Sequence, residues 1–281
     1  MNGIISPTHK NLPNYSMRHL ALILLFMLSF LSAQSLAATD GTALAKKLYE
    51  RPDGSDASLH ATMILSKKGS KPRYRTLYSY RLDNENGETW SLMRFTEPAD
   101  INGTGLLTHD RPGDDSSQWI YLPALDRARR ISSSRKGGRF VGSDIYYEDL
   151  RKRDVGKDQH RIIGSGMVGR TATTRLESIP LDPDNSVYSK RISWVHMNTL
   201  VPLQVDYYTA GNESPVKRMK VNKIQKLQGY WTVLDNTVYD LESGHQTRLV
   251  TRAIKYDQQL PVKLFSRQTL SDTRMEQAYR P

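Results

Sequence analysis

Three carboxylates in a short segment are the residues whose types and spacing could do acid–base chemistry. Asp144, Glu148 and Asp149 form the tightest acidic group of the chain, and the first two are four positions apart. On a helix that spacing places two carboxylates on one face, where they could donate and accept protons. Arginines surround this group in the sequence, so structural ion pairing is the stronger interpretation.

Other catalytic and metal-binding patterns are weak. The five histidines after the N-terminal segment have no H-x-x-x-H spacing, and the chain has neither a G-x-S-x-G elbow nor a cysteine. The stretch 164–169 fits G-x-G-x-x-G, but the strand-like residues 171–174 follow it where a dinucleotide site needs a helix. We therefore expect a hairpin turn there, and a protein without enzymatic activity, cofactor or metal.

The densest positive charge lies between Arg127 and Arg139. One interpretation is contact with lipid headgroups or with an acidic partner. The other is a solvated strand and loop that the acidic group neutralises. The candidate contact residues are Arg129, Arg130, Arg135, Lys136 and Arg139.

Aromatic residues give a further signal. All four Trp fall in expected strands, and 15 Tyr accompany only 5 Phe. Alternation places Trp90 with Leu92 on one face, which suits either core packing or a concave apolar face that holds a ligand. The residues expected to line such a cavity are Met63, Leu65, Tyr78, Tyr80, Trp90, Leu92, Trp119, Tyr121, Ile192 and Trp194.

The N-terminus indicates export. The apolar run 20–31 follows Arg18 and precedes Ser35-Leu36-Ala37, which predicts a signal peptide over residues 1–37, with Met17 as an alternative start. A retained anchor is the other interpretation, although the run is short for a membrane span. The rest, 38–281, should be one periplasmic domain, and the lack of cysteine argues against lipidation. Export also argues against nucleic acid as the counterpart of the +11 net charge.

Strands dominate the elements that position these residues. Helices are expected at 40–51, at 143–151 with Ser143 or Asp144 as cap, and at 266–272. Strands are expected at 59–66, 74–82, 88–95, 104–109, 117–122, 126–132, 160–165, 170–179, 188–197, 203–209, 216–227, 230–241 and 246–256. Such a long antiparallel sheet must curl or close.

Two motifs resemble a known family. Trp119–Ile131 follows W-x-Y-L-P-A-L-x-R-x-R-R-I, and Phe140–Leu150 follows F-x-G-S-D-x-x-Y-E-D-L. Phe95-x-x-Pro98 with Ile101-Asn-Gly-Thr104 adds to them. This pattern resembles the periplasmic outer-membrane lipoprotein-sorting family, the LolA-like relatives of the LolA and LolB carriers. Asp126, Ala128 and Ile145 stand where Gly, Val and Phe are common in that family.

The resemblance implies both a fold and a role. The fold would be a mainly β, open and strongly curved half-barrel with a few short helices over its concave side. Its implied role is to carry a lipid, a lipoprotein acyl chain or other hydrophobic cargo, with transient membrane contact and an RND-type (MMPL-like) exporter or an outer-membrane acceptor as partner. The resemblance implies no catalytic residues.

The motif also has a physical interpretation as a lid or plug. Gly142 would let the chain bend before the helix 143–151, whose acids would meet the arginines of the preceding strand. The residues of this lid are Asp144, Tyr146, Tyr147, Glu148, Asp149 and Leu150. The leading hypothesis is a carrier. The alternative is a periplasmic adaptor that docks on an RND-type transporter, transports nothing, and has a filled concave face.

Overall fold

The computed structural model of the protein describes residues 41–113, 116–132 and 136–281. The expected signal peptide, residues 1–37, and Arg135 lie outside the described residues. In the described ranges, no helix is both long and apolar enough to cross a membrane.

One antiparallel sheet of thirteen strands forms the protein, and every expected strand is present within a few residues of its predicted bounds. Its spatial order is β6-β5-β4-β3-β2-β1-β13-β12-β11-β10-β9-β8-β7. The strands are β1 (Asp56–Lys67), β2 (Arg73–Asp83), β3 (Thr89–Glu97), β4 (Gly105–Asp110), β5 (Ser117–Leu122), β6 (Arg127–Arg130), β7 (Asp158–Val168), β8 (Thr171–Pro180), β9 (Lys190–His196), β10 (Val201–Tyr208), β11 (Lys217–Leu227), β12 (Tyr230–Asp240) and β13 (His245–Tyr256).

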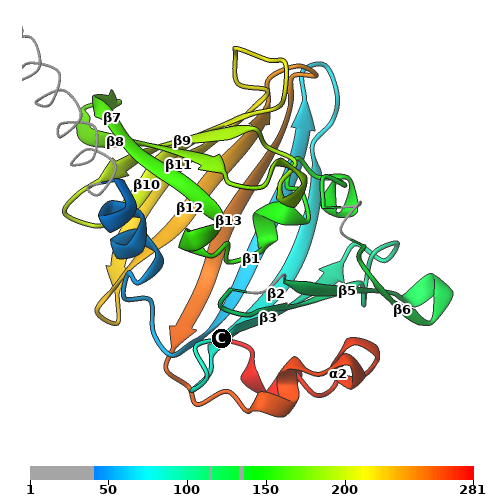
Figure 1. Ribbon diagram of the computed structural model, residues 1–281. Helices are drawn as coiled ribbons and strands as arrows, with labels where there is room; N and C mark the ends of the chain where they lie inside the picture. Colours follow the sequence, from blue (N-terminus) through cyan, green and yellow to red (C-terminus); the bar gives the residue numbers. More distant parts are fainter. Residues whose placement is uncertain (1–40, 114–115, 133–135) are drawn as a thin grey trace, which may run out of the picture.

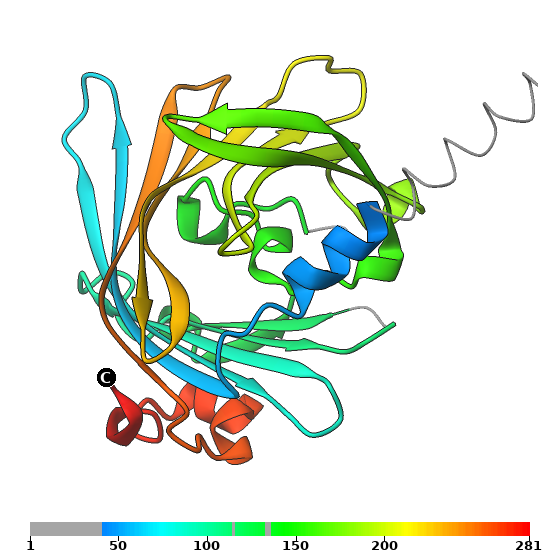
Figure 2. The ribbon, with the colours of Figure 1, turned by 90° about the vertical axis from the view of Figure 1, so that its left-hand side faces the viewer.

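The sheet is strongly curved and does not close into a barrel (Figures 1 and 2). Its two edge strands, β6 and β7, follow each other in the sequence, so the chain between them must pass from one edge to the other. Most of this connection, the plug segment 136–157, lies in the hollow of the sheet, as does the helix 41–49 (Figure 2). The expected mainly β, open and strongly curved half-barrel is therefore confirmed.

Two of the three expected helices form. In the helix 41–49, Leu44 and Ala45 are buried against Leu176 of β8 and Val195 of β9, which accounts for their helical spacing. The short α2 (Arg267–Ser271) begins where expected, because the Ser266 hydroxyl accepts a hydrogen bond from the Thr269 amide at 3.3 Å.

The expected helix over 143–151 is wrong. Short 3₁₀ turns at Phe140–Gly142 and Glu148–Leu150 replace it. Ser143 is not an N-cap: its hydroxyl donates to the Phe140 carbonyl at 2.7 Å and accepts from the Ile145 amide at 3.2 Å. Asp149 likewise accepts from the Tyr146 amide at 2.6 Å. The amides of Tyr147 and Glu148, which a helix would pair with the carbonyls of Ser143 and Asp144, donate instead to the carbonyls of Gly138 and Lys136 at 3.1 and 3.0 Å.

Two apolar clusters cover opposite faces of the sheet. The inner cluster lies on the concave face, where strand residues pack against Phe140 and Ile145 of the plug segment. Its strand residues include Ala61, Met63, Leu65, Leu77, Phe95, Leu106 and Ile120. The outer cluster joins β2–β5 to the C-terminal segment 260–281, which lies beneath the sheet in Figure 2. Its buried residues are Tyr80, Leu92, Leu107, Tyr121, Leu260, Leu264, Phe265 and Leu270.

A buried ion pair fixes the C-terminal segment to the sheet. Arg94 of β3 donates from Nε to Glu276 at 2.9 Å, and the two side chains are 1% and 0% exposed. The same guanidinium donates to the carbonyls of Thr269 and Leu270 at 2.7 and 2.8 Å. A Cβ at position 105 would lie 2.7 Å from Arg94 Nη1, so only glycine fits beside this guanidinium.

Candidate functional site

The concave face leaves a cavity of about 290 Å³ near the middle of the sheet, which we call the β1–β13 cavity. Apolar side chains from the three neighbouring strands β1, β13 and β12 form much of its wall, with Ser79 and Arg81 of β2, Asn236 and the chain after the first helix at its polar side. Its lining residues are Arg51, Asp53, Ala57, Leu59, Ser79, Arg81, Trp231, Thr232, Val233, Asn236, Leu249, Thr251, Ile254 and Tyr256. Its size is typical of a site for a small molecule or a short length of chain.

Polar groups on one side of this cavity bind the strands to the chain that follows the first helix. Arg51 Nη1 donates to the Trp231 carbonyl at 2.7 Å, and Arg81 Nη2 donates to the Gly54 carbonyl at 2.9 Å. Asp53 lies 3.4 Å from the Arg81 guanidinium. Burial raises the pKa of the Asp53 carboxyl, and Arg81 opposes that shift. The cavity is therefore amphiphilic, with an apolar wall and a charged rim.

A second cavity of about 340 Å³, the β7–β10 cavity, lies between the first helix, the plug segment and the inner face of β7–β10. Its lining combines apolar residues such as Leu48, Leu176 and Val205 with several ionisable groups. Arg153 and Arg191 both bind the carboxylate of Asp158, whose side chain is 4% exposed. The lining as a whole holds four carboxylates and three arginines, so its charges nearly balance.

His160 lines the β7–β10 cavity, and its imidazole is hydrogen-bonded to neighbouring residues of the cavity wall. Its Nδ1 lies 2.9 Å from the Ser178 hydroxyl and its Nε2 lies 3.0 Å from the Val155 carbonyl. Burial lowers the pKa of this imidazole, and Arg191 and Arg153 add to that effect. Both ring nitrogens of His160 thus have partners within the wall of the cavity. Among residues 41–113, 116–132 and 136–281, no group of three His, Cys, Asp or Glu could hold a metal ion.

The three acids of the motif bind the plug segment to the sheet. Asp144 is 1% exposed and accepts from Arg139 at 2.6 Å and from the Thr247 hydroxyl of β13 at 2.7 Å. Glu148 accepts from the Val187 amide at 2.8 Å. An ion pair thus holds Asp144, whereas hydrogen bonds from Ser186 and Val187 hold Glu148. Their partners are not the arginines of β6 that the sequence predicted, because the motif does not form the helix that would have presented them to that strand.

The third acid, Asp149, is paired with a buried lysine. Lys217 Nζ of β11 lies 2.5 Å from Asp149 and 3.8 Å from the ring centre of Tyr146. Rings of Tyr188 and Tyr207 complete the surroundings at 4.8 and 4.7 Å. Burial lowers the pKa of the Lys217 ammonium, although Asp149 opposes it. The remaining motif residues, Tyr147 and Leu150, pack against the inner cluster.

The ten expected ligand-lining residues do not share one face. Met63 and Leu65 belong to the inner cluster, where the plug segment already covers them. Six others pack in the outer cluster beneath the C-terminal segment: Tyr78, Tyr80, Trp90, Leu92, Trp119 and Tyr121. Ile192 and Trp194 alternate with Arg191 and Ser193, which line the β7–β10 cavity, so they point away from it.

The five expected basic contact residues are also separated. Arg129 and Arg130 are exposed on the edge strand β6, and Arg130 donates to the Ser117 hydroxyl at 3.2 Å. Lys136 donates to the Asp184 carbonyl at 2.5 Å, and Arg139 is bound to Asp144 and Asp240. Arg135 lies outside the described residues.

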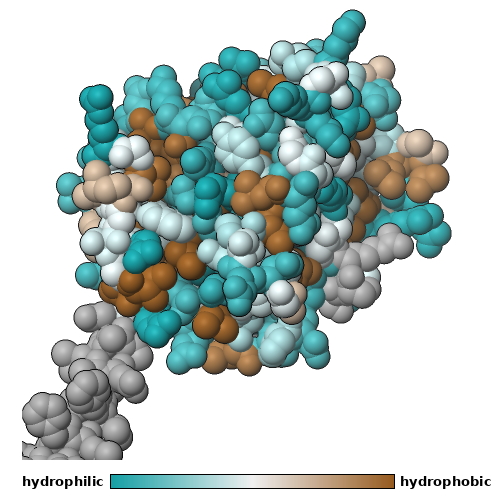
Figure 3. Space-filling view, turned by 90° about the horizontal axis from the view of Figure 1, so that it is seen from above, coloured by the Kyte–Doolittle hydropathy of each residue, from teal (hydrophilic) through white to brown (hydrophobic). Residues whose placement is uncertain are grey.

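The sequence analysis missed the residues of the β1–β13 cavity. Leu59, Ser79 and Leu249 belong to expected strands but lie on the faces that carry fewer aromatic residues. The one available signal was the alternation of Leu77, Ser79 and Arg81 with the tyrosines of β2. Seen from above, hydrophobic residues form separate patches among hydrophilic ones (Figure 3). Hydrophilic residues therefore separate the apolar surface of that face into several small patches.

Comparisons with known proteins place this architecture in a family. A family model described as an uncharacterized protein matches residues 87–272, more than half of the chain. A crystal structure of a DUF1329 family protein from Desulfovibrio piger is 29% identical, with a TM-score of 0.79 over 83% of this chain and 99% of that one. The chain belongs to this LolA-like family. No curated protein matches it significantly.

Two further structures resemble the LolA-like chain. One, from Vibrio parahaemolyticus, is described as an outer membrane lipoprotein-sorting protein domain and is 28% identical, with a TM-score of 0.78 over 83% of this chain and 99% of that one. The other is a LolA superfamily protein from Nitrosomonas europaea, 18% identical, with a TM-score of 0.65 over 82% and 98% of the two chains. The second likeness concerns the fold alone.

Proposed function

We propose that the protein is a periplasmic carrier that holds a lipid, a lipoprotein acyl chain or other hydrophobic cargo on the concave face. The observation that carries this proposal is the β1–β13 cavity, whose wall includes Leu59, Val233 and Leu249. Burying an alkyl chain there would contribute about 0.8 kcal/mol per methylene. The name of the relative from Vibrio parahaemolyticus, a lipoprotein-sorting domain, supports the same role.

The cavities favour a carrier over an adaptor that transports nothing. An adaptor needs no space inside the sheet, and the plug segment could have filled the hollow. It fills only part of it, because cavities of about 290 and 340 Å³ remain on either side of the chain that runs from Ala45 to Asp53. An RND-type exporter or an outer-membrane acceptor is the proposed partner, with the exposed Arg129 and Arg130 of β6 as its contact.

A cavity-filling variant tests the carrier proposal. Ser79→Trp puts an indole into the β1–β13 cavity from a position of β2 whose side chain makes no hydrogen bond within the described residues. If the indole displaces two methylenes of bound cargo, the cost is about 1.6 kcal/mol, or roughly tenfold in affinity. Binding of a fluorescent fatty acid measures this loss.

The matched control is Thr62→Trp, the same change on the outer face of β1, where Thr62 accepts a hydrogen bond from Arg252. It should bind the fatty acid as well as the unchanged protein does. Native mass spectrometry of protein purified from periplasm supplies the second measurement. Protein that is always free of ligand, and that also takes up no fatty acid, would contradict the carrier proposal.

A further inference from the structure

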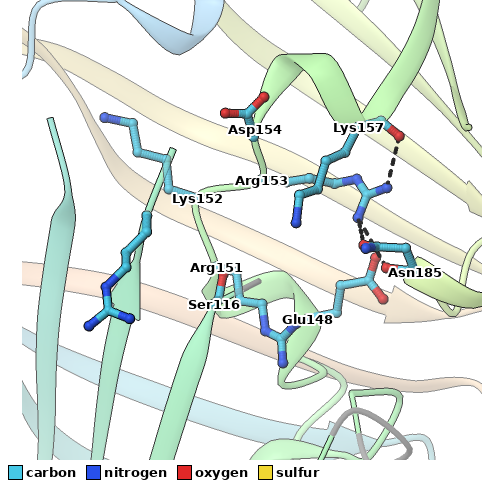
Figure 4. A pocket seen from close by; sticks show the side chains of 9 residues that line it. Ser116, Glu148, Arg151, Lys152, Arg153, Asp154, Lys157 and Asn185 are labelled. Atoms are coloured by element: carbon cyan, nitrogen blue, oxygen red, sulfur yellow. Dashed lines mark hydrogen bonds between the residues drawn. The ribbon is translucent and has the colours of Figure 1, made fainter. Parts of the chain in front are cut away.

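A small pocket rich in cations adjoins the β7–β10 cavity, and we call it the cationic pocket (Figure 4). Among the described residues, five cationic side chains and two carboxylates line it. Its charged lining residues are Arg111, Glu148, Arg151, Lys152, Arg153, Asp154 and Lys157. Glu148, Arg151, Arg153 and Asp154 also line the β7–β10 cavity, so the two spaces share a wall.

The two carboxylates of the cationic pocket already have partners in the fold. Glu148 accepts from the Val187 amide at 2.8 Å. Asp154 accepts from the amides of Gly156 and Gly113 at 2.7 and 3.1 Å. Because backbone amides satisfy these oxygens, the acids hold the loops in place and only partly offset the surrounding positive charge.

The cations differ in how firmly they are held. Arg153 is fixed by Asp158 at 2.9 Å and by the Asn185 side chain at 3.0 Å, so it forms a rigid wall (Figure 4). Lys152 is held less tightly: its ammonium lies 3.7 Å from Asp83 and 4.7 Å from the ring centre of Tyr49. A half-exposed ammonium with one distant carboxylate can turn toward an anion at small cost.

The space in the pocket fits one polar group and excludes an alkyl chain. Its volume is about 20 Å³, enough for an oxygen or two to enter among the side chains. An anionic group seated there would have the apolar residues of the neighbouring cavity, such as Leu48 and Leu176, beside it for the attached chain. This arrangement matches an amphiphile with an anionic head.

We propose that the cationic pocket binds the phosphate group of an anionic ligand, with Lys152 as the residue that admits it. The phosphate site does not depend on the proposed carrier function. The placement of the ligand's acyl chain in the neighbouring cavity does rest on it. The same chemistry could serve a lipid headgroup or a free phosphate. The site lies apart from the basic residues of β6 that the sequence indicated for headgroup contact.

The experiment compares two probes that share one fluorescent acyl chain, a lysophosphatidic acid and the corresponding monoacylglycerol. The variant Lys152→Gln/Lys157→Gln removes two charges from the pocket. The control Lys68→Gln/Lys71→Gln removes two charges from the exposed hairpin between β1 and β2. We expect the pocket variant to bind the lysophosphatidic acid about tenfold more weakly, since hydrogen bonds to charged groups contribute at least this much. Its affinity for the monoacylglycerol should change less than twofold.

Inorganic phosphate, at constant ionic strength, separates this inference from the carrier proposal. If phosphate shifts the amide resonances of 151–157 in the unchanged protein and not in the pocket variant, the phosphate site is supported, even when neither lipid probe binds. Failure of both lipid probes to bind would contradict only the carrier proposal. Competition between phosphate and the lysophosphatidic acid assigns the site to a headgroup. The inference is overturned if phosphate produces no such shift and the pocket variant treats both probes alike, or if the control loses as much affinity as the pocket variant.

Discussion

At the scale of single residues, the side chains that could have served in acid–base catalysis have hydrogen-bond or ion-pair partners inside the fold. The acids of the motif meet Arg139, Lys217 and backbone amides, and His160 is bonded at both ring nitrogens. Asp126, where the family often has Gly, adopts a φ of +42°, the left-handed region that glycine favours. Its carboxylate accepts from the Tyr121 hydroxyl at 2.8 Å, a bond that glycine could not make.

Stability should fall as the solution becomes acidic, because burial lowers the pKa of both His160 and His109 below 6.5. Above that pH both histidines are neutral in the folded and in the unfolded chain. Their titration then makes no contribution to the pH dependence of the unfolding free energy. As the pH falls through 6.5 toward the folded-state values, the unfolded chain binds protons first, so the free energy of unfolding decreases. Each histidine can contribute a slope of at most about 1.4 kcal/mol per pH unit.

Urea unfolding at pH 8 and pH 5.5 measures this effect. The variant His160→Gln keeps a polar group near Ser178 and cannot titrate, so the difference in unfolding free energy between the two pH values should shrink. An unchanged difference in this variant and in His109→Gln would show that other groups control the acid sensitivity.

At the scale of elements, the segments outside the regular strands decide which face of the sheet is available. The plug segment occupies part of the concave face, and the C-terminal segment 260–281 covers the aromatic outer face of β2–β5. Burial raises the pKa of Glu276, which anchors the second segment, although Arg94 opposes that shift. The outer cover therefore depends on a buried charge pair.

Glu276→Ala should destabilise the protein by about 3 kcal/mol or more, since it leaves the Arg94 guanidinium buried without its carboxylate. Loosening of the cover should also expose Tyr80 and Leu92 and increase binding of the dye ANS. The control Asp272→Ala breaks the exposed pair with Arg274 and should destabilise the protein far less than Glu276→Ala does. Equal effects of the two variants in urea unfolding would refute this account.

At the scale of the whole molecule, an open sheet has two free edges in its described part, β6 and β7, and one of them is strongly basic. The chain carries 40 Lys and Arg against 29 Asp and Glu. Positive charge on an edge strand discourages pairing with other sheets and attracts an acidic partner. This favours β6 as the place where the proposed exporter docks.

Charge reversal at that edge, Arg129→Glu/Arg130→Glu, should weaken capture of an RND-type exporter from the same cell at low salt by at least tenfold, because like charges then face each other. The difference should shrink in high salt. Reversal of Lys68 and Lys71 serves as the control. If both double variants capture the exporter equally well, β6 is not the docking edge.

The sequence by itself determined the strands, the helices at both ends and the family resemblance. These follow from local signals: alternation with a period of two, caps such as Ser266, and the motif Trp119–Ile131. Alternation in β2 puts Tyr78 and Tyr80 on the face opposite Ser79 and Arg81, and these two tyrosines pack in the outer cluster. Alternation does not say which of the two faces is concave.

Only the tertiary structure decided which face is concave and what covers each face. A period of two distinguishes two faces of a strand without saying which is buried by a distant segment. Here the C-terminal segment, which begins 138 residues after the end of β5, buries the aromatic face, and two cavities remain on the other face. Such contacts depend on the path of the whole chain, so local pattern could not reveal them.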